Sequence, residues 1–181
     1  MPAPRAMTRH TLSALKGWPS PHAVDFSAPF DPSVFTQTRP IINAGTVVRL
    51  NNNGQYELGV GTQRVMPLFL FTDSSAPDVE NPGGNPATDR SAFVGIGPTG
   101  KAMALVAVGA YELVSTEFDP AGTYTPNTPL TSPDSGPNAG TLRPGTWYTD
   151  MIVGVVSRGI VDNGHGYPAV AFWPCPVFPT Q

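Results

Sequence analysis

The chain has little cysteine and little charge. Cys175 is the only cysteine among the 181 residues, so the protein has no intrachain disulfide and no cysteine cluster that would bind a metal. Charged residues make up 13% of the chain, and the formal net charge is −3. Nucleic-acid binding depends on a clustered basic face, and the 10 basic residues of this chain form no such cluster in the sequence. We therefore expect no nucleic-acid partner.

Long hydrophobic runs are also missing. The longest apolar stretch, residues 102–111, falls far short of the ~20 residues that a membrane-spanning helix needs. Residues 1–17 contain Arg5, Arg9 and Lys16 but no continuous apolar segment like that of a signal peptide. These features predict a soluble protein that is not secreted by this route and has no membrane partner.

Proline and glycine are abundant, with 22 and 19 residues, while 40% of the chain is hydrophobic. Disordered chains rich in these two residues are usually polar, because they lack the apolar area that offsets ordering entropy. Proline also breaks helices, since it has no N–H and clashes with the preceding turn. The composition predicts a mainly β fold, a small β barrel or sandwich, with long Pro-rich loops and an extended N-terminal arm.

The arm is expected over residues 1–40, which contain seven prolines. Ordering its backbone costs about 1–2 kcal/mol per residue, so it needs a surface to lie on. That surface is either a partner protein or the chain's own core, and the sequence leaves both open. The residues expected to contact a partner are four aromatic anchors on the arm, two on the C-terminal tail and two arginines: Trp18, Phe26, Phe30, Phe35, Trp173, Phe178, Arg39 and Arg49.

The β domain is expected over residues 41–181, with long loops at 72–90 and 118–145. Two hairpins are predicted because an Asn-Gly pair, which tolerates positive φ, separates two β-like runs in each case. The first joins runs 45–50 and 55–60, and the second turns at Asn163 and Gly164. The run 65–71 contains Pro67, which favours a sheet edge or a bulge.

One segment resembles a phosphate-binding loop. Residues 95–101, Gly-Ile-Gly-Pro-Thr-Gly-Lys, match the pattern G-x-x-x-x-G-K-[ST] except at its last position, where Ala102 replaces the hydroxyl that holds magnesium. A true loop of this kind also precedes a long helix, and Gly109 follows too soon for one. A turn between two strands, with Lys101 in solvent, explains the segment better than a nucleotide hydrolase does.

No other chemistry has a convincing pattern. The three histidines are scattered, and the acidic residues of loop 72–90 do not follow the spacing of a calcium-binding loop. The nucleophile pattern G-x-S-x-G is missing. We therefore expect no metal, no cofactor and no catalytic site, hence no enzyme. Tyr56, Trp147 and Tyr148 offer an alternative, a platform on which sugars stack, although aromatic packing is the commoner use.

Short β runs bounded by glycine, together with proline-rich loops, give the chain a family likeness. These stretches read IINAGTVVRLNNNGQYELGV, VMPLFLF, GPTGKAMALVAVGAYELVSTEFD, YTPNTPLT, AGTLRPG and MIVGVVSRGIVDNGHGYPAVAFWPCPVFP. Over residues 41–179 the chain resembles the capsid decoration (cement) proteins of tailed bacteriophages. The resemblance implies a compact, β-tulip-like domain, often a homotrimer, that is made in the host cytoplasm and sits on the outside of the virion.

The resemblance also implies a function. Such a protein binds major capsid protein subunits and stabilises the contacts between them, so the chain is expected to be a virion structural protein without enzymatic activity. The alternative is a carbohydrate-binding head-appendage or fibre domain of a phage, which would use the aromatic platform. A cement protein acts by mass action, because it binds the intact shell and shifts the balance away from rupture.

Overall fold

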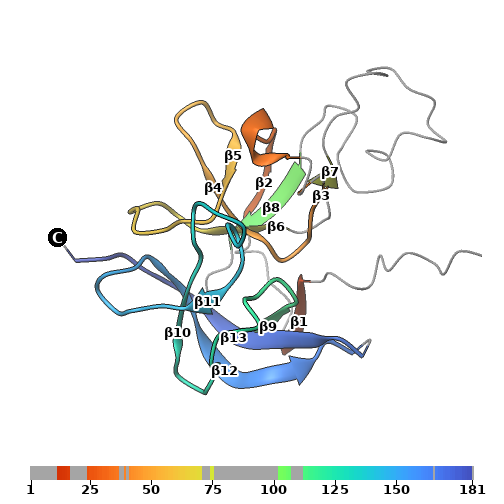
Figure 1. Ribbon diagram of the computed structural model, residues 1–181, viewed down its shortest axis with the longest axis vertical. Coiled ribbons are helices and arrows are strands. Elements are labelled where there is room, and N and C mark those ends of the chain that lie inside the picture. The colour runs from red at the N-terminus through yellow and green to blue at the C-terminus, as the bar shows by residue number, and fades with distance from the viewer. Residues whose placement is uncertain are drawn as a thin grey trace, which may run out of the picture.

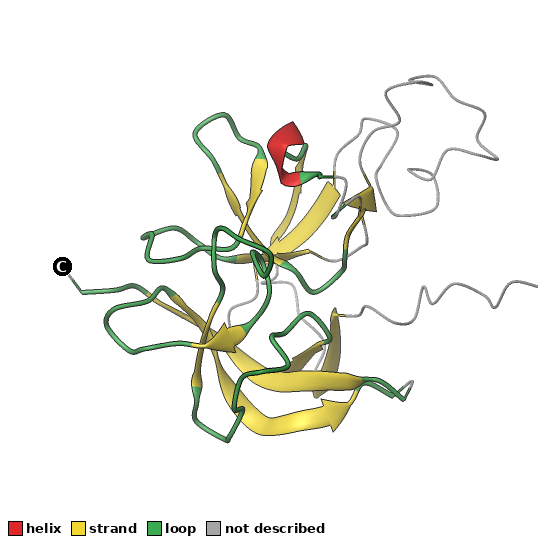
Figure 2. Cartoon of the chain, viewed as in Figure 1, coloured by secondary structure: helices red, strands yellow, loops and turns green. Residues whose placement is uncertain are grey.

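A computed structural model of the chain describes residues 12–16, 24–36, 39, 41–70, 74–75, 102–106, 112–164 and 166–180. Side chains are described from residue 28 on, except in the short strands at 74–75 and 102–106. The described residues form β-strands and one short 3-10 helix, η1 (Pro32–Val34). Figure 2 shows how strands and loops dominate the chain. The predicted mainly β class is confirmed.

Sheet A is the larger of the two main sheets and has six antiparallel strands. Their order is β1 (Leu12–Lys16), β9 (Glu112–Ser115), β13 (Pro168–Val177), β12 (Ile152–Asp162), β10 (Pro129–Thr131) and β11 (Arg143–Pro144). The predicted C-terminal hairpin is confirmed, since β12 and β13 pair from Asp162 and Pro168 back to Ile152 and Val177. Asp162 Oδ1 closes the turn by accepting the backbone N–H of Gly164 at 2.6 Å.

Sheet B has five antiparallel strands, in the order β2 (Val24–Ala28), β8 (Ala102–Val106), β6 (Leu68–Leu70), β4 (Val47–Leu50) and β5 (Tyr56–Leu58). The predicted N-terminal hairpin is confirmed, because β4 pairs with β5 and Gly54 adopts a φ of 71° in the turn. The Asn51 side chain accepts two backbone N–H groups there. A third sheet pairs β3 (Ile41–Ile42) with β7 (Ser74–Ser75).

The placement of β6 corrects the prediction for the Pro67 run. The strand lies between β4 and β8, in the interior of sheet B and not at an edge. It begins at Leu68, one residue after Pro67. The proline therefore precedes the ladder, and its missing N–H removes no hydrogen bond from the sheet.

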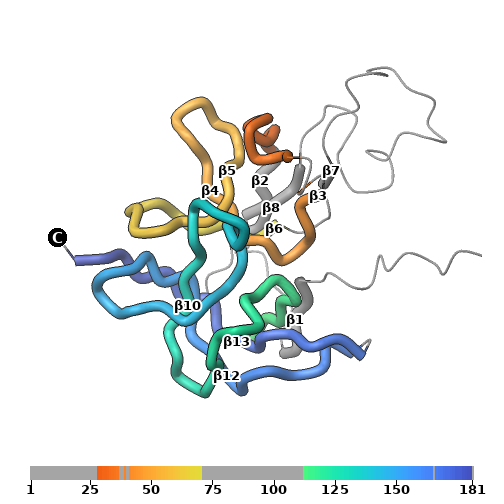
Figure 3. The backbone as a smooth tube through the Cα atoms, in the orientation of Figure 1, coloured from red at the N-terminus to blue at the C-terminus, as the bar shows by residue number. Residues whose placement is uncertain are grey.

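The main core joins the two large sheets. Its fully buried residues come from both, with Val47 and Phe69 from sheet B and Val153, Val170 and Phe172 from sheet A. The rings of Phe69 and Phe172 lie 5.4 Å apart between centroids. Figure 1 shows sheet B above sheet A, and in Figure 3 the chain from residue 112 onward builds the lower half, while the loop after β10 rises to sheet B. One face of each sheet is thus buried against the other.

The described N-terminal residues lie on the chain's own sheets, one of the two surfaces that the sequence left open for the predicted arm over 1–40. In the part that the structure describes, β1 pairs with β9 at one edge of sheet A, and β2 pairs with β8 at one edge of sheet B. The segment after β2 continues along β5, where Tyr56 N–H donates to Pro29 O at 2.8 Å and Asp31 N–H donates to Tyr56 O at 2.9 Å. Sheet edges offer unpaired backbone groups, so these segments find their partners on the chain's own sheets.

The predicted loop 118–145 is not a structureless connection. It contains β10 and β11 and buries Tyr124, Leu130 and Leu142. The Tyr124 hydroxyl lies 2.7 Å from Asp119 O and 3.0 Å from Leu142 O, so its hydrogen ties two backbone segments together. Burial, together with the charge of Asp119, raises the pKa of Tyr124 to about 12. The predicted loop 72–90 lies outside the described residues except for β7.

Candidate interaction surface

The predicted C-terminal anchors are exposed. Trp173, on β13, is 39% exposed, and Phe178, just after that strand, is 45% exposed. Of the predicted arm anchors, Trp18 lies outside the described residues. Phe26 lies in β2 opposite Ala104, but the structure describes only its backbone. Trp173 and Phe178 are therefore the predicted aromatic anchors whose side chains face solvent among those described.

Phe30 and Phe35, two of the predicted arm anchors, pack within the chain. Phe30 is buried against Tyr56, with ring centroids 5.4 Å apart and planes at 64°. Phe35 packs edge-on against Phe30, also at 5.4 Å, and is half-buried. Edge-to-face pairs of this kind add stability beyond the area that they bury. Both rings therefore fix the N-terminal segment onto sheet B.

The two predicted contact arginines also bond within the chain. Arg49 is buried, and its Nη1 donates to Leu58 O and Gly59 O, both at 2.8 Å, while Nη2 pairs with Glu57 Oε2 at 2.5 Å. The Nη2 atom of Arg39 donates to Gly136 O at 3.1 Å and Pro137 O at 2.7 Å. Arg49 thus braces the β4–β5 hairpin, and Arg39 ties the N-terminal segment to a loop 97 residues further along.

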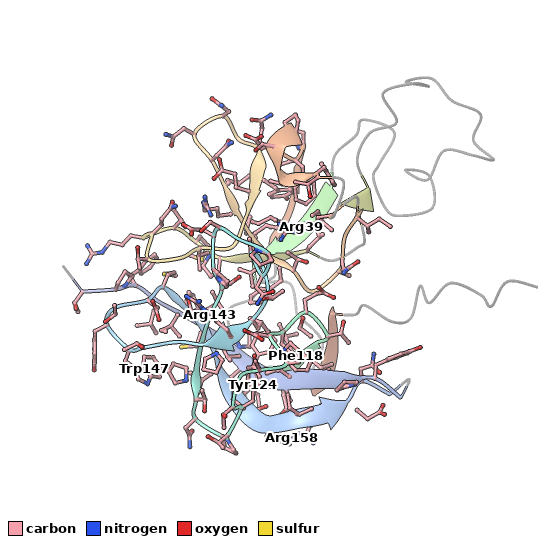
Figure 4. The ribbon with its side chains drawn as sticks, viewed as in Figure 1. Arg39, Phe118, Tyr124, Arg143, Trp147 and Arg158 are labelled. Atoms are coloured by element: carbon pink, nitrogen blue, oxygen red, sulfur yellow. The ribbon has the colours of Figure 1, made fainter. Side chains whose placement is uncertain are left out.

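Several large exposed apolar side chains belong to segments at the end of the molecule that carries the C terminus. Three segments meet there: the loop between β5 and β6, the loop between β11 and β12, and the C-terminal tail (Figure 1). Their large exposed side chains, which we call the loop–tail surface, are Met66 at 44%, Trp147 at 39%, Tyr148 at 66% and Phe178 at 45%. Figure 4 shows Trp147 at the outer edge of this end.

The loop that carries Trp147 and Tyr148 is held closed by its own hydrogen bonds. Thr146 N–H donates to Asp150 Oδ2 at 2.8 Å, and Asp150 N–H donates to Thr146 O at 3.0 Å. Met151 N–H then donates to Gly61 O at 3.1 Å, which joins this loop to the one after β5. Tyr148 adopts a φ of 69°, a conformation that costs energy for a bulky residue and persists only where the surroundings impose it.

Hydrogen bonds with two other segments hold the last described residues of the C-terminal tail in place. Arg64 donates from Nε at 3.0 Å and from Nη2 at 2.7 Å to Pro179 O. Thr180 N–H donates to Tyr148 O at 2.9 Å, and its hydroxyl lies 3.2 Å from the same oxygen. Sequence reasoning missed Arg64 and Met66, because the arginine acts on a residue 115 positions away. Phe178 is therefore exposed on a fixed backbone.

A buried polar cluster lies elsewhere, on sheet A. Glu112 is buried and receives two hydrogen bonds from Arg158, at 2.8 and 2.6 Å, and one from the Ser157 hydroxyl at 2.5 Å. Ser157 and Arg158 occupy an irregularity in β12, where the register shifts between Val156 and Gly159. Arg158 pairs with the carboxylate, and the cluster joins β12 to β9.

Other candidate chemistry is limited. Within the described ranges, no group of three or more His, Cys, Asp or Glu side chains is arranged to hold a metal ion. The phosphate-loop-like segment 95–101 and the three histidines lie outside those ranges. Cys175 is exposed. Tyr56 is completely buried, which corrects the sugar platform of three rings, whereas Trp147 and Tyr148 remain exposed.

Comparison with known proteins gave no match to a protein-family model, a curated protein or a solved structure. Function therefore has to be inferred from the residues of this chain. Among the described residues, no helix is long and apolar enough to span a membrane.

Proposed function

We propose that the protein is a virion structural protein, a capsid decoration protein that binds the outside of a phage shell and stabilises contacts between major capsid subunits. The observation that carries this proposal is the exposure of large apolar side chains on a chain with few charges. Tyr148, Phe178, Met66, Trp147 and Trp173 are each more than a third exposed. Exposed apolar area of this kind usually marks an interaction site.

A contact function also suits the way in which the exposed rings are held. Reinforcing a shell needs contacts and no reaction, and backbone segments that are already fixed lose little conformational entropy on binding. We further propose that sheets A and B form a β-tulip-like sandwich, and that the protein assembles as a homotrimer on the shell. Among the described strands, no pairing closes either sheet into a barrel.

Sedimentation with capsids tests the proposal. Purified protein is mixed with phage heads that lack it, the heads are pelleted, and the bound protein is quantified over a range of concentrations. We expect saturable binding with a fixed number of copies per head. Protein that stays in the supernatant at every concentration up to about 100 μM, well above the micromolar range of weak specific complexes, would contradict the function.

The exposure of Trp147 and Tyr148 supports a second candidate function, that of a carbohydrate-binding head-appendage or fibre domain of a phage. Aromatic faces of this kind can stack on sugar rings, but the third ring of the predicted platform, Tyr56, is inside the core. A glycan array separates the two functions. Specific glycan binding by protein that does not bind heads would favour the appendage.

A further inference from the structure

We propose that the loop–tail surface is the face that docks onto the shell protein. This inference rests on the proposed function and adds to it which side of the molecule faces the shell. Four of the residues that the sequence predicted to contact a partner bond or pack within the chain: Phe30, Phe35, Arg39 and Arg49. The loop–tail surface is instead open to solvent.

The composition of the loop–tail surface is that of a protein interface. Cores of such interfaces are enriched in Tyr, Trp, Phe, Met and Arg and depleted of Lys, Asp and Glu. The surface offers Tyr148, Trp147, Phe178 and Met66, with Arg64 beneath the tail. A site for sugars would instead need free polar groups that converge beside the rings. The neighbouring carboxylate, Asp150, uses its Oδ2 to accept the backbone N–H of Thr146.

Hydrogen bonds fix the backbone under the loop–tail surface in the free protein. Asp150 closes the loop, Arg64 holds Pro179 O, and Thr180 holds Tyr148 O. The strained backbone of Tyr148, with its φ of 69°, presents its ring with 66% exposure. Strain of this kind gathers at functional sites, where it places a side chain in advance. Docking therefore needs little reordering of this end.

The size of the surface favours a shell over a second free copy as its occupant. Applying the exposed fractions to the ~150–250 Å² of a large buried side chain gives roughly 400 Å². That is about half of the ~800 Å² that each partner contributes to a stable interface. Two free copies would therefore pair weakly through it. A shell repeats its binding sites, so the linked subunits of the proposed homotrimer can bind several sites at once. They gain avidity in this way although each single contact is modest.

The test compares binding to heads between the wild type and two variants. The first combines Trp147→Ser, Tyr148→Asn and Phe178→Ser, all at exposed positions, and asparagine tolerates the positive φ at 148. The matched control is Ile160→Ser, which removes a side chain that is 47% exposed near the opposite end of β12. We expect the triple variant to bind at least about thirtyfold more weakly, as for the loss of an interface hot spot, and the control to bind like the wild type.

Several outcomes would overturn the inference. If the wild type binds heads and the triple variant binds equally well, the docking face is elsewhere, although the proposed function stands. If the variant loses self-association or glycan binding while head binding is unchanged, the surface serves a second copy or a sugar. If the wild type does not bind heads, the proposed function itself fails, and the inference fails with it.

A second measurement covers the case in which the triple variant does not fold. Hydroxyl-radical footprinting of the wild-type protein, free and bound to heads, reports the accessibility of individual aromatic side chains. We expect binding to protect Trp147, Tyr148 and Phe178 and to leave Ile160 unchanged. Equal modification of the three rings in the free and bound states would overturn the inference without any variant.

Discussion

Gly59 and Gly54 allow the packing of the loop 133–140 against sheet B to be tested with a matched pair of substitutions. Both glycines have positive φ, 64° and 71°, so alanine at either position meets a similar backbone cost of about 1–2 kcal/mol. At Gly54 an added Cβ has no atom within 4 Å. At Gly59 it would overlap the carbonyl oxygen of Pro133 and lie 2.5 Å from the carbonyl carbon.

The extra cost at Gly59 follows from the hydrogen bonds that its neighbours make. Pro133 O accepts the N–H of Gly140 at 2.9 Å, and Gly59 N–H donates to Val47 O at 2.8 Å. The backbone must shift to admit the methyl group, which strains or breaks both bonds. At about 1–3 kcal/mol for each of the two hydrogen bonds lost, we expect Gly59→Ala to destabilise the protein by about 2–6 kcal/mol more than Gly54→Ala.

Urea denaturation followed by near-UV circular dichroism measures this difference. For an m-value of about 2 kcal/mol/M, the midpoint of Gly59→Ala should lie roughly 1–3 M below that of Gly54→Ala, or the variant should fail to fold. Midpoints for the two variants that agree within error would refute the close approach of Pro133 to β5, and with it the packing of this loop on sheet B.

Three further predictions concern Tyr124, the buried carboxylate and salt. Tyr124→Phe should cost about 1 kcal/mol at pH 7, because both carbonyls also accept backbone N–H groups. The folded state holds the neutral phenol, so the wild type's advantage over this variant is present below pH 10 and should be lost between pH 10 and about 12 in pH-dependent denaturation. Arg158→Ala should lower the thermal midpoint more than Glu112→Gln does. The first change leaves the buried Glu112 charge without its arginine, whereas the second leaves an Arg158 charge that is half exposed to water; equal midpoints would contradict this. Head binding should change less than about threefold between roughly 50 and 500 mM NaCl, since the proposed contact is apolar, and a steep salt dependence would indicate ion pairs instead.

The elements that the sequence predicted best are those set by local chemistry. Both hairpins could be placed because Asn53-Gly54 and Asn163-Gly164 carry their turn preference in two adjacent residues. The mainly β class followed from proline content and apolar content together. In each case the deciding interactions lie within a few residues of one another.

The contacts that the sequence could not place join residues that are far apart in the chain. Arg39 and Phe30 were predicted to contact a partner, with the chain's own core as the alternative surface for the arm, and their contacts within the chain come from Gly136, Pro137 and Tyr56. Pro67 suggested a sheet edge, but β6 begins one residue later, at Leu68, so the proline takes no part in the hydrogen bonds of this interior strand. No local pattern reports which distant backbone carbonyl an arginine will reach.

For the same reason, the sequence singled out residues of the loop–tail surface but did not predict that they lie at the same end of the molecule. Phe178 was singled out as an anchor, and Trp147 and Tyr148 as a sugar platform, but nothing linked the two groups. Their link is the pair of hydrogen bonds from Thr180 to Tyr148 O and the clamp of Arg64 on Pro179 O. Such a surface can be inferred only after the chain has been folded.

The most direct test of the central claim is the rupture temperature of phage heads with and without the bound protein. Heads that lack the protein are saturated with it, unbound protein is removed, and release of the packaged DNA is followed with an intercalating dye during heating. A protein that reinforces contacts between capsid subunits should raise the release temperature in proportion to its occupancy. An unchanged release temperature at full occupancy would contradict the account.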